Sequence, residues 1–146
     1  MRDHLYSSDI NEIGTATKGQ VGRYGYISNG TVCLLYIKQV KGSVPLYRYW
    51  KGDINNDHFY TTDPDEIGVT IPLQVGKYGY ICEGNVGYCF PKADTGEGLL
   101  VDLVPLHRYW KESFKDHYYT TDTNEIGDGY VYEGIECYVV PYTQDT

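Results

Sequence analysis

Short runs of apolar and aromatic residues punctuate the chain, and glycine, asparagine, aspartate or proline separates one run from the next. Between residues 44 and 90 four such runs follow one another: PLYRYW, HFYTT, YGYIC and GYCF. Runs rich in aromatic and β-branched residues that end at turn formers are typical of strands. Seventeen tyrosines and seventeen glycines, beside a single methionine, also favour strands and turns over helices. The pattern therefore predicts an all-β chain.

The runs recur in three blocks, each marked by one twelve-residue motif. It reads DHLYSSDINEIG from residue 3, DHFYTTDPDEIG from residue 57 and DHYYTTDTNEIG from residue 116. VPLYRYW and VPLHRYW precede the second and third copies, but only two residues precede the first. Tight turns at SNGT (28–31) and EGNVG (83–87) are expected to join the third and fourth runs of a block into a hairpin.

Four strands in each of three blocks predict a β-trefoil, since a barrel capped by hairpins leaves no exposed strand edge. We expect one domain over residues 1–146, with repeats at about 1–43, 44–103 and 104–146 (blocks one, two and three). Block one lacks its first strand, so eleven strands are expected, with the gap covered by the C-terminal tail or by a second copy in a homodimer. An open β-sandwich is the alternative fold.

The back half of the motif has the signature of a single capped helical turn. Asp63 is a good N-cap, Pro64 suits the first helical position, Glu66 stands three residues after the cap and Gly68 follows the end. A calcium loop would need more acids and the spacing of an EF-hand. Arg48 of VPLYRYW is expected to pair bidentately with an acid of the neighbouring turn. The corresponding turn residues are Asp9, Glu12 and Gly14 in block one, and Asp122, Glu125 and Gly127 in block three.

The front half of the motif keeps an aspartate, a histidine and a tyrosine in all three blocks, while the residue between histidine and tyrosine varies. Two interpretations stay open. These side chains form a buried hydrogen-bonded network, or they form a small polar pocket that binds a hydroxyl-rich ligand. The candidate ligand-binding residues are Asp3, His4, Tyr6, Asp57, His58, Tyr60, Asp116, His117 and Tyr119.

Charge and motifs exclude several function classes. The net charge of −8 argues against nucleic acid and against an anionic membrane surface. No apolar run approaches the roughly 20 residues of a membrane-spanning helix, and MRDHLYSSD lacks the apolar region of a signal peptide. There is no nucleophile elbow, phosphate-binding loop or zinc-protease motif, and adjacent strand residues such as Asp57 and His58 point to opposite faces. We therefore expect neither an enzyme nor a metal or cofactor, and a zinc site built from three equivalent histidines is disfavoured.

The four cysteines allow two states. Cys82 and Cys89 flank EGNVG and could bridge the expected hairpin, whereas Cys33 and Cys137 take equivalent positions in different blocks and are expected to be too far apart to pair. A hairpin disulfide with two thiols fits a secreted protein, and four thiols fit the cytosol. The glycosylation sequon at Asn29 would be used only after secretion.

The stretch VPLYRYW…DHFYTTDPDEIG…YGYICEG resembles a tandem-repeat family with the hallmark PLYR…HFYTTD. That family is catalogued as a domain of unknown function, appended to secreted hydrolases and found in lectin-like animal proteins. The resemblance covers nearly the whole chain, and block one departs from it by lacking the first strand. It implies a secreted binding module for carbohydrate, and no catalytic residue can be carried over from it.

We therefore expect a lectin-like module with two or three equivalent weak sites that gain avidity by multivalency. Its partners would be glycans. The alternative is a protein-interaction or inhibitor module that acts through the longest insertion, Pro91–Asp102. A repeat with a purely structural role is a third interpretation.

Overall fold

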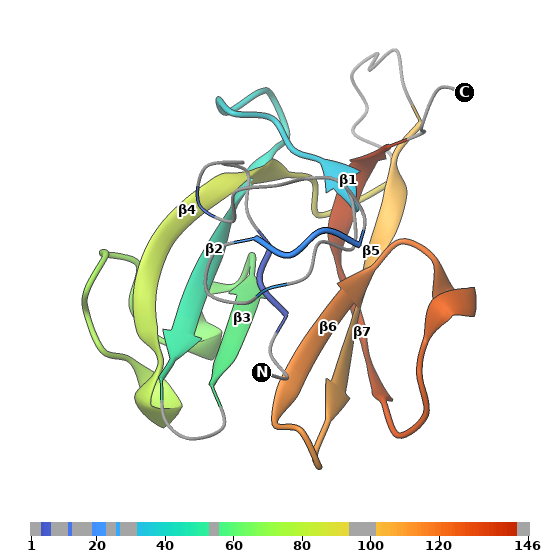
Figure 1. Cartoon of the computed structure of the whole chain (residues 1–146). Coiled ribbons are helices and arrows are strands. Elements are labelled where there is room, and N and C mark those ends of the chain that lie inside the picture. Colours follow the sequence, from blue (N-terminus) through green and yellow to red (C-terminus); the bar gives the residue numbers. More distant parts are fainter. Residues whose placement is uncertain are drawn as a thin grey trace.

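Antiparallel strands and short 3-10 turns build the chain, which is all-β as predicted (Figure 1). The computed structural model describes residues 4–6, 12, 19–22, 26, 32–52, 56–93 and 102–142. The elements are β1 (Cys33–Leu34), β2 (Val44–Lys51), β3 (Asp57–Thr61), η2 (Pro64–Glu66), η3 (Lys77–Gly79), β4 (Ile81–Cys89), β5 (Val104–Lys111), β6 (Asp116–Thr120), η4 (Thr123–Glu125) and β7 (Val131–Pro141).

The strands form two sheets, which lie side by side in Figure 1. One has the order β3-β2-β4 and the other β1-β7-β5-β6. Both use the same register: Arg48 of β2 stands opposite Tyr60 and Gly84, and Arg108 of β5 stands opposite Tyr119 and Gly134. Residues at equivalent places in blocks two and three of the sequence thus take equivalent places in the two sheets.

Short backbone pairings between blocks join the C-terminal end of β4, the C-terminal part of β7 and the segment at and after β1. Phe90 and Tyr138 exchange two backbone hydrogen bonds, of 2.9 and 2.7 Å, and so link the end of β4 to β7. Tyr36 and Tyr88 exchange a second pair, which links the segment after β1 to β4. Together with the β1–β7 pairing, these bonds connect all three blocks in a closed circuit.

The predicted hairpin at EGNVG is wrong. β4 runs without reversal from Ile81 to Cys89, so blocks two and three each contribute three strands where four were expected. Gly84 and Gly87 adopt positive φ angles of 103° and 157°, but they serve β-bulges in a continuous strand. The SNGT segment lies outside the described residues, as does the C-terminal tail beyond residue 142.

Of the two states that the cysteines allowed, the Cys82–Cys89 bridge is excluded for the same reason. The two residues occupy one strand seven positions apart, which places them roughly 23 Å from each other at about 3.3 Å per residue, far beyond disulfide range. All four cysteines are free thiols. Cys33, Cys89 and Cys137 gather in one core cluster.

The core has two parts. The first holds Leu46, Leu106 and Val139 together with Tyr60 and Tyr119, and it lies where the blocks meet. The second lies within block two and contains Tyr49, Phe59, Ile67, Tyr80 and Cys82. In the part of the chain that the structure describes, no helix has the length and apolarity to cross a membrane.

Candidate functional site

Three tyrosines, one from each block, form a cyclic hydrogen-bonded ring. The hydroxyl of Tyr60 accepts from the backbone N–H of Tyr6 (2.6 Å) and donates to its carbonyl (2.5 Å). The Tyr119 hydroxyl bonds the backbone of Tyr60 in the same way (2.7 and 2.8 Å), and the Tyr6 hydroxyl bonds that of Tyr119 (2.8 and 2.9 Å). The rings meet edge to face, with centroids 5.2–5.5 Å apart.

This ring ties the blocks together. Tyr60 and Tyr119 are only 3 % and 2 % exposed, and each hydroxyl already uses its proton and one acceptor position. Burial raises the pKa of Tyr6 and Tyr119 well above the ordinary value. The tyrosines among the candidate residues therefore belong to the buried hydrogen-bonded network.

The aspartate of the motif holds the histidine of another block. Asp57 accepts from the backbone N–H of His117 (3.0 Å), contacts its ring Nδ1 (2.7 Å) and accepts from the Tyr80 hydroxyl (2.5 Å). As expected from the alternation of strand side chains, the ring that Asp57 orients is not that of its neighbour, His58. His58 instead lies 3.5 Å from a carboxylate oxygen of Glu83.

The same arrangement links block three to block one. Asp116 accepts from the backbone N–H of His4 (3.0 Å), contacts its Nδ1 (2.5 Å) and accepts from the Tyr130 hydroxyl (2.9 Å). Asp57 and Asp116 are 3 % and 0 % exposed, so both carboxylates are buried in these contacts. Asp3, the third aspartate, lies outside the described residues.

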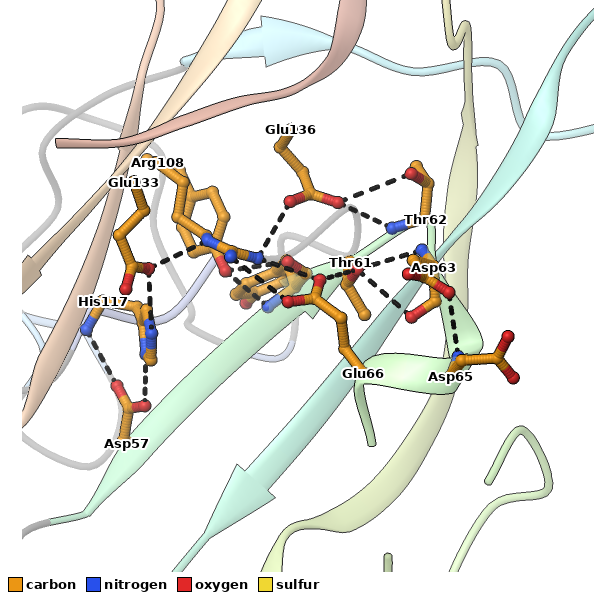
Figure 2. A network of polar contacts seen from close by, with 12 residues as sticks. Asp57, Thr61, Thr62, Asp63, Asp65, Glu66, Arg108, His117, Glu133 and Glu136 are labelled. Atoms are coloured by element: carbon orange, nitrogen blue, oxygen red, sulfur yellow. Dashed lines mark hydrogen bonds and ion pairs between the residues drawn. The ribbon is translucent and has the colours of Figure 1, made fainter. Parts of the chain in front are cut away.

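Arg108 is the centre of a carboxylate cluster, shown in Figure 2. Its Nη1 and Nη2 donate to the two oxygens of Glu66 (3.1 and 3.2 Å), Nε donates to Glu133 (2.9 Å), and Nη1 also reaches Glu136 (3.1 Å). Arg48 repeats the fork on Glu12 (2.8 and 2.7 Å) and donates to another glutamate through Nε. The predicted bidentate pairing with a turn is confirmed for Arg108, whose partner Glu66 belongs to η2, and Arg48 makes the same fork on Glu12, the corresponding residue of block one.

Two β-bulges aim the glutamates of β7 at Arg108. In the pairing with β5, Gly134 stands opposite Arg108 and Tyr132 opposite Tyr109, so Glu133 is an extra residue with no partner in the register. A second shift leaves Glu136 unpaired in the register as well. A bulge redirects a side chain toward a functional or structural target, and here both extra residues reach the same guanidinium.

The capped turn is present as predicted. Asp63 accepts from the backbone N–H of Asp65 (3.0 Å), and Gly68, at φ 94°, closes the turn by donating to the Pro64 carbonyl (2.7 Å). Asp122 caps η4 in block three with the same bond, of 2.9 Å. The turn has 3-10 geometry. It presents Glu66 to Arg108, which connects block two to block three.

The charges of the cluster perturb its titration. Burial opposes protonation of His117, but hydrogen bonds to Asp57 and Glu133 outweigh it and raise the histidine pKa. Burial would raise the pKa of Glu133, yet the bond from His117 and the nearby positive charges lower it. Burial dominates at Glu136 and raises its pKa, because Arg108 offsets only part of the desolvation.

A pocket of about 350 Å³ opens beside this cluster. Three buried side chains line it: Phe59, Ile67 and Tyr80. The charged groups of Glu66, Arg108, His117 and Glu133 line it as well, together with the exposed residues Asp65, Lys77 and Tyr78. Of the nine candidate residues, His117 is the one that lines this pocket.

Tyr78 is the most exposed aromatic residue of the pocket, at 73 %. Its backbone is left-handed, with φ 61°, a conformation that costs a non-glycine residue about 1 kcal/mol or more. Neither Tyr78 nor Lys77 was predicted as a site residue, because both lie outside the twelve-residue motif. Glu133 was not predicted either, although the recurrence of Glu-Gly at 83–84 and 133–134 could have indicated it.

The family described as "Domain of unknown function (DUF5648)" matches residues 1–90. The chain belongs to this family. The match ends at Phe90, just after β4, so the DUF5648 region supplies one side of the pocket, while Arg108, His117 and Glu133 lie beyond it. Comparison with curated proteins and with solved structures gives no match. In the described residues, no group of three or more histidine, cysteine or acidic side chains could hold a metal ion.

Proposed function

We propose that this DUF5648 protein is a carbohydrate-binding, lectin-like module and that the pocket beside Arg108 is its main sugar site. The observation that carries the proposal is the exposed, strained Tyr78 at a polar pocket. An aromatic ring offers a face for the C–H side of a sugar, and polar groups around it can bond the hydroxyls. Sites of this size take small ligands.

The charge balance of the pocket favours a neutral ligand. Arg108 and Lys77 face the carboxylates of Asp65, Glu66 and Glu133, and the His117 ring, whose pKa is raised by its hydrogen bonds to Asp57 and Glu133, adds a further donor on the side of the two cations. A phosphate or a polyamine would need an unpaired countercharge, which the pocket does not offer. A hydroxyl-rich neutral molecule needs only hydrogen-bond donors and acceptors.

The proposal includes a β-trefoil of three repeats in which equivalent sites lie at block boundaries. The tyrosine ring and the short backbone pairings between blocks support it, since each joins equivalent residues of different blocks. Asp57 acts as a positioning residue for His117, and Asp116 does the same for His4. A homodimer through the incomplete block one remains part of the proposal.

The site between blocks two and three is expected to be stronger than its counterpart between blocks three and one. Asp128 takes the place of Tyr78 in block three, so that boundary has no stacking ring at this position. The alternative, a protein-interaction module acting through the 91–102 insertion, falls largely on residues 94–101, which lie outside the described residues.

A glycan array followed by calorimetric titration tests the proposal. The wild-type chain should bind a neutral glycan weakly, and Tyr78→Ala should abolish the binding because it removes the stacking face without touching the buried network. Tyr142→Ala, which removes another exposed tyrosine, is the matched control and should bind like wild type. Absence of any glycan ligand, or equal binding by Tyr78→Ala, would refute the assignment.

A further inference from the structure

The loop before β4 covers the outer edge of that strand, as Figure 1 shows at the far left. Leu73 donates its N–H to the Cys82 carbonyl, and Cys82 donates its N–H to the Gln74 carbonyl, both at 2.8 Å. Val75 forms a β-bridge with Ile81. The backbone of β4 is therefore paired on both sides: with β2 on one and with its own loop on the other.

Block three has the strand without the loop. Residues 69–79 separate Gly68 from Tyr80 in block two, but only residues 128–129 separate Gly127 from Tyr130. Tyr132 stands opposite Tyr109 of β5 as Cys82 stands opposite Tyr49 of β2. In the described part of the chain, no backbone group outside β5 hydrogen-bonds to residues 131–135.

The exposure of the two strands differs accordingly. Cys82 is fully buried, while Tyr132 is 51 % exposed, and Val131 and Ile135 are 63 % and 46 % exposed. A Cβ added at Gly84 would meet Pro72 of the loop at 3.4 Å, whereas one added at the equivalent Gly134 would meet nothing within 4 Å. The start of β7 is thus an open strand edge that carries three apolar side chains.

We infer that this edge, residues 131–135, is a docking site for an extended segment of a partner protein, which adds to the sheet as a further strand. Open edges with apolar side chains are templates for such strand addition. The loop on β4 shows the kind of segment that fits the equivalent edge: apolar residues at alternate positions, Ile71, Leu73 and Val75.

The charges near the edge define the partner further. Asp122 and Asp128 are exposed in the turns that lead into β7, Lys111 lies beside Gly129 and offsets one of them, and the chain carries a net charge of −8. The segment that docks is therefore basic as well as apolar at alternate positions. A second copy docked at this edge through its own residues 131–135 would bring the same two exposed aspartates beside these, and the repulsion disfavours self-pairing at this place.

A peptide copied from the loop that pairs with β4 can test whether the edge at residues 131–135 accepts a further strand. A fluorescein-labelled peptide with the sequence of residues 69–77, VTIPLQVGK, contains the three alternating apolar residues and one lysine. We expect saturable binding to the full chain by fluorescence polarisation, and slower amide hydrogen exchange at Tyr132 when the peptide is present. A peptide of the same composition in scrambled order should bind at least about tenfold more weakly, because strand addition requires the alternation.

Variants at exposed positions locate the site. Val131→Lys or Ile135→Lys should each weaken peptide binding about tenfold, because a charged side chain on the edge removes an apolar contact with the added strand. Ile37→Lys places the same charge at an 86 % exposed apolar residue elsewhere and should bind like wild type. Circular dichroism confirms that each variant is folded, and the exchange measurement on wild type needs no variant.

Three results would overturn the inference. They are no saturable binding at millimolar peptide, no added protection of the Tyr132 amide, or equal binding by the two edge variants and wild type. Sedimentation showing that the chain pairs with itself through residues 131–135 would also overturn it, since a second copy would then be the occupant. None of these four results bears on the sugar pocket, whose test uses Tyr78.

Discussion

Replacing Tyr119 by phenylalanine removes one oxygen from the tyrosine ring and tests how much that ring stabilises the fold. The hydroxyl makes two hydrogen bonds to the backbone of Tyr60, and both lie in the buried interior. Each is worth about 1 kcal/mol net, and each backbone group left without a partner costs about 1–3 kcal/mol. We therefore expect Tyr119→Phe to lower the free energy of unfolding by about 2–5 kcal/mol, a large part of the 5–15 kcal/mol typical of a domain.

Guanidinium chloride unfolding followed by tryptophan fluorescence measures this loss as a lower midpoint at unchanged slope. Tyr132→Phe is the matched control: its hydroxyl bonds an exposed histidine ring, His107, so its loss should cost no more than about 0.5 kcal/mol. Tyr60→Phe should fall between the two, because the backbone of Tyr6 is only half-buried and water can replace the hydroxyl. If Tyr119→Phe shifts the midpoint no further than Tyr132→Phe, the ring is not a major source of stability.

Three further predictions follow from the cluster and the thiols. Arg108→Met leaves three carboxylates without their cation, one of them the buried Glu136, and should lower the free energy of unfolding by about 3–5 kcal/mol, measured by thermal unfolding. A change within about 0.5 kcal/mol would show that the carboxylate cluster does not depend on Arg108. Because the folded-state pKa of His117 is raised, its contribution to stability is full below about pH 6.5 and is lost as the pH rises through the folded value. Unfolding titrations across neutral pH should show this loss, and His117→Gln should flatten the slope; an unchanged slope would contradict the assignment. Burial raises the pKa of Cys33 to about 12, and the other three thiols are buried. Ellman's reagent should therefore react slowly with the native chain, whereas in denaturant it should titrate all four thiols. A count below four in denaturant would reveal a disulfide.

Features set by neighbouring residues could be predicted from the sequence. The capped turn follows from Asp63 and Gly68 alone, since a cap and a left-handed glycine act within a few residues. The bidentate pairing of Arg48 with a glutamate of the motif followed from the preference of guanidinium for carboxylate, but that the glutamate is Glu12 of block one was not predicted.

The error at β4 has an equally local cause. Gly84 and Gly87 do take positive φ angles, as the tight-turn prediction required. However, the same glycine signal marks a β-bulge, in which the strand gains a residue and continues. Only the pairing partner, β2, distinguishes the two, and the sequence does not name the partner.

The pairing of Asp57 with His117 could not be predicted, although the sequence indicated both as candidates. Sixty positions separate them, and strand alternation rules out the adjacent His58 but leaves the histidines of both other motif copies, His4 and His117, as equal candidates. Which block supplies the histidine depends on how the blocks pack. Tyr78 was beyond prediction for a different reason: its exposure and left-handed backbone are visible only in three dimensions.

The tyrosine ring also constrains how the chain folds. Its hydrogen bonds span 54, 59 and 113 positions, so the core cluster where the blocks meet needs all three blocks, whereas the second cluster lies within block two. Such distant contacts give a high contact order, and high contact order slows folding. The ring cannot close until block three has been synthesised, and until then Tyr6 and Tyr60 lack the Tyr119 contacts that they have in the folded chain.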